Sequence, residues 1–395
     1  MKKNNTANFA LQILFNIATF ARVPIKCFFT KSVKFIYDNC KQFTFKNRKL
    51  KNLYRTKGKS AILLGFQNNI SWLLCGRTFV NIAAVKGVAE IVVNADGLFV
   101  ICNNVEAKRL AEEEFPSGTT IRTYDWFSPV ERDKIIGELT RNNYISDADC
   151  ENELRNLRTI MTENERETYI SLGKNCAEAM QKTCFSVKQG MSELQISAIL
   201  AANCIEAGIE PIVNLVAADE RIFLHRHPLP TAKILKNYAM IVLCGRRFGQ
   251  VISLTRFISF GELSAEIIKK REAVQNLDAL LFIETRPNAV IGDIFAKLVK
   301  GYENEGYADE WKLHHQGGLT GYDSREVKAG FETNLIVKAG QVYAWNPSIT
   351  GYKSEDTFLV GETENLILTE TDQFPHRKFN FNGIEFEKAD ILRLK

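Results

Sequence analysis

The sequence lacks closely spaced cysteine pairs, and this absence excludes two common kinds of scaffold. Its nine cysteines are scattered over 395 residues, and no two of them form a C-x-x-C motif. Disulfide frameworks and structural zinc sites of small domains depend on such spacing. We therefore expect reduced thiols in a cytoplasmic protein.

The chain also lacks an apolar run long enough to cross a bilayer. The apolar run near the N-terminus, Phe9–Ala21, is interrupted by Gln12, Asn16 and Thr19, whereas a spanning helix needs about 20 consecutive apolar residues. No small-residue cleavage signal clearly follows it. We expect residues 1–32 to form a basic N-terminal extension, with a signal peptide, an organellar targeting segment and an amphipathic membrane anchor as the alternatives.

Basic charge is scarce outside the first 60 residues. Those residues hold fourteen Lys and Arg and one acidic residue, a net charge of +13. Because the whole chain has a net charge of +5, the other 335 residues carry a net charge of −8. A mildly acidic body argues against a broad nucleic-acid surface. We expect no nucleic-acid partner, while membrane contact through the basic N-terminus stays open.

Length and patterning predict two domains of the α+β class. Residues 33–150 mix short strands and helices and are predicted to form a small α/β domain, in which Asp96-Gly97 makes a hairpin turn. Residues 158–395 contain two helices followed by strands, and then the same order again. Ser192 is the predicted N-cap of the second helix. The order predicts an internally duplicated antiparallel sheet with helices on one face.

Two adjacent histidines stand in a glycine-rich stretch, Trp311–Glu326. Glycine lets the backbone approach a ligand or another strand closely, so polar side chains on such a backbone favour a functional site over a plain turn. If His314 and His315 lie on a strand, they point to opposite faces. We then expect at most one of them to face a given pocket.

Five segments, taken in order, resemble one known superfamily. They contain His227-Pro228, Thr255-Arg256-Phe257, the stretch His314–Glu326, Asn346-Pro347 and Glu355-Asp356-Thr357. From Ser60 to Val360 the chain resembles the Xaa-Pro aminopeptidases, prolidases, methionine aminopeptidases and creatinase. The resemblance implies a creatinase-type N-terminal domain and a pseudo-twofold pita-bread domain, a curved antiparallel sheet with helices on its outer face. It also implies a homodimer.

The ligands of the superfamily's metal centre are mostly missing. Its active metallopeptidases hold two divalent ions with two Asp, one His and two Glu. In this chain the resemblance places these five positions at Leu243 (or Val242), Ser253, Gly318, Asn346 and Glu355. A single carboxylate does not supply the charge that two hard cations need to give up their water. We therefore expect no metal and no cofactor.

The resemblance then favours a metal-independent hydrolase that cleaves a C–N bond of a small amino-acid-like or peptide substrate, as creatinase does. His227 is the predicted general acid/base, because histidine titrates near neutral pH. Glu355 and His314 complete the predicted catalytic set. The predicted substrate-binding residues are His225, Ser253, His315, Arg325, Glu326, Asn346 and Arg77.

Three alternatives stay open. The chain could be a non-catalytic pseudopeptidase that binds a ligand or a partner protein. It could also be a metal-dependent Xaa-Pro aminopeptidase or dipeptidase. Finally, Cys244 adjoins the lost first aspartate, and a one-residue shift would turn its thiol into the pocket as a nucleophile beside His227, or as a zinc ligand with His225 and His227.

Overall fold

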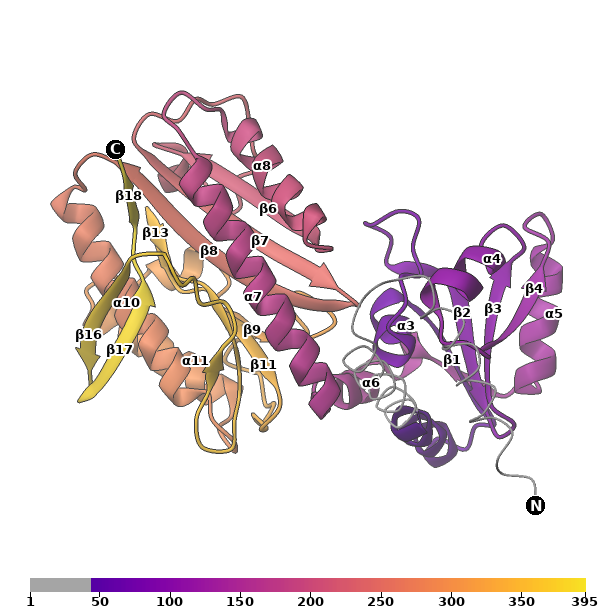
Figure 1. Ribbon diagram of the computed structural model, residues 1–395. Coiled ribbons are helices and arrows are strands. Elements are labelled where there is room, and N and C mark those ends of the chain that lie inside the picture. Colours follow the sequence, from indigo (N-terminus) through magenta and orange to yellow (C-terminus); the bar gives the residue numbers. More distant parts are fainter. Residues whose placement is uncertain (1–43) are drawn as a thin grey trace, which may run out of the picture. The chain divides into compact units, whose positions relative to one another are not determined.

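The structure is a computed structural model that describes residues 44–395, and its compact unit spans Lys49–Lys395 (Figure 1). The predictions for the basic extension, residues 1–32, lie outside the described residues. Among residues 44–395, no helix combines the length and the apolar character needed to cross a bilayer. The predicted domain boundaries, 33–150 and 158–395, stay predictions.

The first part of the described chain is a five-stranded mixed sheet with helices. The strands follow the order β4-β3-β2-β1-β5. The predicted hairpin is confirmed, since β2 and β3 pair antiparallel and Asn94 Oδ1 accepts hydrogen bonds from the backbone of Asp96 and Gly97. The elements are β1 (Ala61–Phe66), α3 (Gln67–Leu74), β2 (Lys86–Asn94), β3 (Leu98–Asn103), α4 (Ala107–Arg109), a π-helical turn (Leu110–Glu114), β4 (Thr120–Tyr124), α5 (Pro129–Thr140), β5 (Tyr144–Ser146), a 3₁₀ turn (Asp147–Asp149) and α6 (Glu151–Arg158).

The second part has the predicted duplicated order of two helices and then strands. The first half contains α7 (Glu163–Ser186), α8 (Glu193–Glu206), β6 (Glu210–Ala218), α9 (Arg221–Leu224), β7 (Tyr238–Arg247) and β8 (Gln250–Phe260). The second half contains α10 (Ala265–Glu284), α11 (Ile291–Asn304), a 3₁₀ turn (Glu310–Leu313), β9 (Gly317–Thr320), β10 (Val327–Lys328), β11 (Val342–Trp345), β12 (Ser348–Ile349), β13 (Tyr352–Lys353), β14 (Asp356–Leu359) and β15 (Leu366–Ile367). The chain ends in β16 (His376–Phe381), β17 (Ile384–Ala389) and β18 (Leu392–Leu394).

Each half contributes one sheet. The first sheet has the order β18-β8-β7-β6, and the second has the order β10-β9-β11-β14-β15. Helices α7 and α8 lie along the first sheet, and α10 and α11 belong to the second half (Figure 1). The predicted cap of α8 is confirmed, because Ser192 Oγ accepts a hydrogen bond from the backbone N–H of Gln195.

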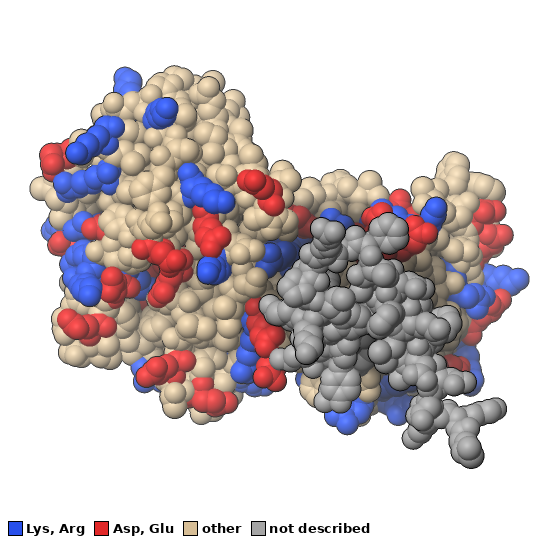
Figure 2. All heavy atoms as spheres, viewed as in Figure 1, with Lys and Arg blue, Asp and Glu red and all other residues tan. Residues whose placement is uncertain are grey.

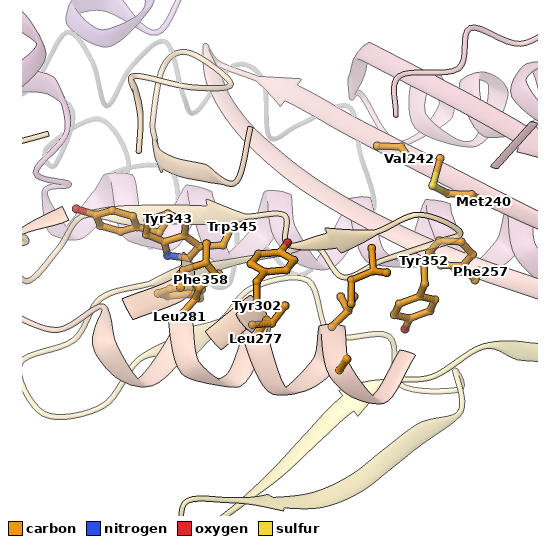
Figure 3. Packing of buried hydrophobic residues seen from close by; sticks show 14 of the residues in the cluster. Met240, Val242, Phe257, Leu277, Leu281, Tyr302, Tyr343, Trp345, Tyr352 and Phe358 are labelled. Carbon is orange, nitrogen blue, oxygen red and sulfur yellow. The ribbon is translucent and has the colours of Figure 1, made fainter. Parts of the chain in front are cut away.

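A buried core cluster joins the inner face of the first sheet to the second half. Met240 and Val242 of β7 and Phe257 of β8 point into it, and Tyr343 and Trp345 of β11 enter from the other sheet (Figure 3). Trp345 Nε1 donates a hydrogen bond to Thr285 Oγ1 at 3.0 Å. Outside the core, Lys and Arg are interspersed with Asp and Glu over the face that Figure 2 shows.

The hairpin β7–β8 has a tight turn that fixes its register. Arg247 pairs with Gln250, and the two turn residues, Phe248 and Gly249, have φ values of +52° and +82°. Positive φ at both central residues is the geometry of a type I′ turn, which suits the twist of two adjacent strands and normally takes Asn-Gly or Gly-Gly. Phenylalanine in this conformation is strained.

We expect the substitution Phe248→Asn to stabilise the protein by about 0.5–1 kcal/mol, because asparagine tolerates the left-handed conformation better than phenylalanine does. Urea denaturation measures the change. Phe248→Ala is the matched control, since it removes the ring but keeps a residue that disfavours positive φ. Equal effects of the two substitutions would show that loss of the half-exposed ring, and not relief of backbone strain, is responsible.

Candidate functional site

Three histidines from two separate segments of the chain converge. His227 lies in the loop between α9 and β7, and His314 and His315 lie between the 3₁₀ turn and β9. Their nearest ring nitrogens all lie within 4.8 Å of one another, and His227 Nε2 is 3.1 Å from His314 Nε2. His314 is buried, His315 is half-buried and His227 is exposed, so the group is reached from the His227 side.

An ion pair joins the two segments that carry the histidines. Arg226 donates to Glu310 Oε2 at 2.6 Å and to the hydroxyl of Thr350 at 2.9 Å. Thr350 in turn donates its backbone N–H to Glu310. Because Arg226 precedes His227 and Glu310 begins the turn that leads to His314, this contact holds the imidazoles together.

The structure corrects two expectations about these histidines. His314 and His315 precede β9 instead of lying on it, and their ring centroids are only 4.6 Å apart, so both join the same group. His225, two residues before His227, is expected to share its face if the segment is a strand, but residues 225–237 form no regular strand. His225 is exposed and lies outside the group of three. In both cases local loop geometry replaces the alternation that a strand would impose.

Hydrogen bonds orient the two adjacent rings. Ser348 Oγ lies 3.3 Å from His314 Nδ1, and the backbone N–H of Gly317 donates to His315 Nδ1 at 3.3 Å. Burial lowers the pKa of His314 to about 2 and that of His315 to about 4, with the positive charges of Lys353 and Arg325 as further causes. Desolvation and the same cations also lower the pKa of His227. All three rings are therefore neutral at pH 7.

Beside the histidines, two cations hold one buried carboxylate. Arg325 Nη2 lies 2.8 Å from Glu355 Oε1, and Lys353 Nζ lies 2.9 Å from Glu355 Oε2. Thr255 of β8 donates its hydroxyl to the second oxygen at 2.8 Å. Burial alone would raise the pKa of Glu355, but Lys353 and Arg325 outweigh it and hold this pKa well below its usual range. Glu355 is thus a permanent anion whose charge the protein itself neutralises.

The register of β7 and β8 decides which side chains face this cluster. Cys244 pairs with Ser253, and their side chains are in contact, with Sγ 3.2 Å from Oγ. Paired residues share a face of a sheet, so Val242, opposite Thr255, lies on the same side, whereas Leu243 points the other way. Of the two predicted positions for the first aspartate, Val242 is the one on the site face. Cys244 also faces the site, and burial raises the pKa of its thiol.

The residues present do not fit the superfamily's paired ions. Of the five ligand positions, Glu355 alone carries a carboxylate, and Arg325 and Lys353 already occupy its oxygens. Gly318, at the histidine position, has φ +140°, and a Cβ there would lie 2.4 Å from the carbonyl oxygen of Val327.

The remaining predicted site residues divide into two groups. Ser253 accepts a hydrogen bond from Arg325 Nη1 at 3.3 Å, and Asn346 is buried with its Oδ1 unpartnered. Ser253 lies on β8, and Asn346 directly follows β11. By contrast, Arg158 binds the carboxylate of buried Glu326 through Nε and Nη2. Arg77 pairs with Glu114 in the first part of the chain.

The sequence did not identify Lys353 and Ser348 as site residues. Lys353 stands two residues before Glu355 and contacts it directly, and residues i and i+2 of an extended segment lie on one face. That spacing was the available signal. Ser348 gave no comparable signal, because its contact with His314 joins residues 34 positions apart.

We expect Glu355→Gln to destabilise the protein by about 3–5 kcal/mol, because it leaves two buried cations without their anion. Glu362→Gln, at an exposed glutamate nearby in the sequence, should change the free energy of unfolding by less than about 0.5 kcal/mol. Adding Lys353→Met to Glu355→Gln should restore part of the loss, since one uncompensated charge disappears. Urea denaturation of the four proteins measures this. Equal stability of wild type and Glu355→Gln would contradict the ion cluster.

The buried neutral histidines also predict acid sensitivity. The folded-state pKa of His315, about 4, lies below its ordinary value of 6.5. Between these values the unfolded chain binds a proton that the folded chain does not, so stability falls as the pH falls. With chelator present, we expect a loss on the order of 1–2 kcal/mol through this residue between pH 6.5 and pH 4.5. Unfolding of His315→Asn should show a flatter profile; parallel profiles would contradict the assignment.

The fold and site can be compared with known proteins. No curated protein matches the chain. The prolidase from Pyrococcus horikoshii OT3 is similar in structure, with a TM-score of 0.70, 16% identity and coverage of 83% of this chain and 98% of that chain. For the X-Pro aminopeptidase from Thermotoga maritima MSB8 the values are 0.70, 17%, 88% and 99%. For the N-terminal domain of FACT complex subunit SPT16 from Cicer arietinum (chickpea) they are 0.62, 12%, 86% and 96%.

At these identities the similarity shows the fold alone, and it confirms the predicted pita-bread architecture. The family itself follows from the sequence. Residues 169–369, about half of the chain, match the profile of metallopeptidase family M24. The chain therefore belongs to metallopeptidase family M24, a family of peptidase-type hydrolases.

Proposed function

We propose that the protein is a hydrolase that cleaves an amide C–N bond of a small amino-acid-like or peptide substrate without the family's paired ions. The observation that carries this proposal is the juxtaposition of a fixed positive cluster and three neutral imidazoles. Lys353, Arg325 and Glu355 act electrostatically on His227, which supports assigning the two groups to one site.

His227 is the proton carrier in this proposal. Its ring is exposed and neutral, and His314 Nε2 at 3.1 Å orients it. A neutral imidazole accepts a proton from water as the oxygen attacks the substrate carbonyl carbon, and then gives that proton to the leaving nitrogen. The water supplies OH to the acyl product and H to the amine, so the C–N bond breaks with no other reactant.

The cations suit a substrate that carries a carboxylate. Arg325 and Lys353 supply two positive charges against the single negative charge of Glu355, and Lys328 adds a further positive charge near His227. Arg325 Nε has no hydrogen-bond partner within the described residues, and an Arg N–H is a strong donor to a carboxylate or a developing oxyanion. Asn346 Oδ1, also unpartnered, supplies an acceptor for a substrate N–H.

A second candidate is a non-catalytic pseudopeptidase that binds a ligand or a partner protein. The mutual satisfaction of Arg325, Glu355 and Lys353 favours it, because a self-neutralised cluster needs no substrate to be stable. The pita-bread fold also occurs in a domain named as part of a complex subunit. The predicted homodimer belongs with this candidate as much as with the enzyme, and it stays a prediction.

We expect turnover of small peptides with a free C-terminal carboxylate, Xaa-Pro dipeptides included, to persist in excess chelator. His227→Gln should lower kcat by about 10²–10⁴-fold, the usual contribution of a general base. His376→Gln, on β16 and outside the three-histidine group, is the matched control and should keep wild-type turnover. Release of the amine product measures the rate.

Two results would contradict the hydrolase. Turnover restored only by added manganese or cobalt would show a metal-dependent peptidase. No turnover, combined with a raised Tm in the presence of a carboxylate-bearing peptide, would support the binding protein instead.

A further inference from the structure

We propose that His227, His314 and His315 form a binding site for a single divalent transition-metal ion, with a ligand set different from the two Asp, one His and two Glu that hold the family's paired ions. Among residues 44–395, these three side chains are the group whose ligand atoms gather closely enough to hold an ion. This inference goes beyond the proposed hydrolysis and concerns the metal-loaded chain, because an ion bound to His227 would occupy the ring that carries the proton in the metal-free chain.

The distances suit three imidazole ligands. A zinc–nitrogen bond of 2.0–2.1 Å implies a separation of about 3.3 Å between two nitrogens of a tetrahedral site. His227 Nε2 and His314 Nε2 already lie 3.1 Å apart, and all three ligand atoms lie within 4.8 Å of one another. His315 is half-buried, and the proposed site requires its ring to turn toward the other two.

Neighbouring groups orient the proposed ligands. The hydroxyl of Ser348 at His314 Nδ1 leaves Nε2 of that ring to face His227. The Arg226–Glu310 ion pair holds the His227 loop against the turn before His314. Partners of this kind, which fix the tautomer and position of a ligating histidine, accompany most histidine metal sites.

The surroundings select the class of metal. Lys353, Arg325 and Lys328 lie close enough to His227 to act on its charge, and Glu355 is the anion that opposes them. Net positive charge disfavours Mg²⁺ and Ca²⁺, which carboxylate charge normally holds. Zn²⁺, Ni²⁺ and Cu²⁺ instead bind imidazole nitrogen strongly. Three histidines leave a fourth position for water or an anion, and the nearby cations favour the anion.

This site differs from the zinc alternative that the sequence allows. The sequence places Cys244 and His225 near His227, but Cys244 contacts Ser253 and His225 lies outside the group. The proposed ligand set contains His314 and His315 in place of Cys244 and His225. It therefore consists of nitrogen ligands alone, whereas the alternative set mixes sulfur and nitrogen. The two ligand sets differ in their cobalt spectra, which makes them separable.

The test uses the full chain, freed of metal with chelator and then dialysed. Calorimetric titration with Zn²⁺ should show one ion per chain, and titration with Mg²⁺ should show none. Substitution with Co²⁺ should give the visible bands of a low-coordinate site without a thiolate charge-transfer band. Circular dichroism confirms that each variant below is folded.

The variants assign the ligands. His227→Gln and His315→Gln should each weaken Zn²⁺ binding by more than about tenfold, since loss of a ligand costs at least as much as loss of a neighbour that orients one. Added Zn²⁺ should raise the Tm of the wild type and not that of His227→Gln. His225→Gln and His376→Gln are the matched controls and should keep wild-type affinity.

Three results would overturn the proposal. A thiolate band in the cobalt spectrum would assign the ion to cysteine. Unchanged Zn²⁺ affinity in His227→Gln and His315→Gln would remove the three histidines as ligands. Weakened affinity in His225→Gln would indicate a different group around His227. Because binding and Tm are measured without substrate, a failure here is distinct from a failure of the proposed hydrolysis.

Discussion

The carboxylate of Glu355 is held by two buried cations, and the rest of the site depends on this interaction. Arg325, Lys353 and Thr255 approach it from three parts of the chain, so one anion joins β8, β13 and the loop after β9. A buried charge is tolerated only when partners replace the water that it has lost. In this chain the positive charge beside Glu355 comes from side chains, which cannot dissociate as a bound ion can.

Side-chain cations and bound metal ions differ in the chemistry that they can supply. Bound ions activate water directly, whereas the guanidinium and ammonium groups can only attract and orient negative charge. In the proposed hydrolysis, proton transfer comes from another residue, and the adjacent histidines are the groups suited to it. The same cations help to keep those rings neutral, because each positive charge disfavours another nearby. The two halves of the site are therefore coupled through electrostatics as well as through position.

Much of the fold could be predicted from the sequence, because its signals are local. Asp96-Gly97 identified a hairpin turn, Ser192 identified a helix start, and the repeated order of helices and strands predicted the duplicated sheet. The superfamily's motifs also assign the one surviving ligand carboxylate to Glu355, and that assignment stays a prediction. These features depend on neighbours in sequence or on residue identity alone.

The site could be predicted only in part, because its geometry depends on loops and on register. His314 and His315 share one group since they precede β9, and nothing in their spacing showed where that strand begins. The choice between Val242 and Leu243 depended on a two-residue turn that contains Phe248, a residue that rarely adopts its conformation. The role of Lys353 depended on an ion pair, and residue type does not reveal which charge a lysine meets.

The backbone at Gly318 has a consequence for any attempt to convert this protein into a metal enzyme. A side chain there would collide with the carbonyl of Val327 on the neighbouring strand. The substitution Gly318→His would therefore require the backbone of β10 to move. Exchanging residues at the other vacant ligand positions would not help until that strand had moved. A histidine ligand at this position would thus require a change of backbone shape as well as a change of residue.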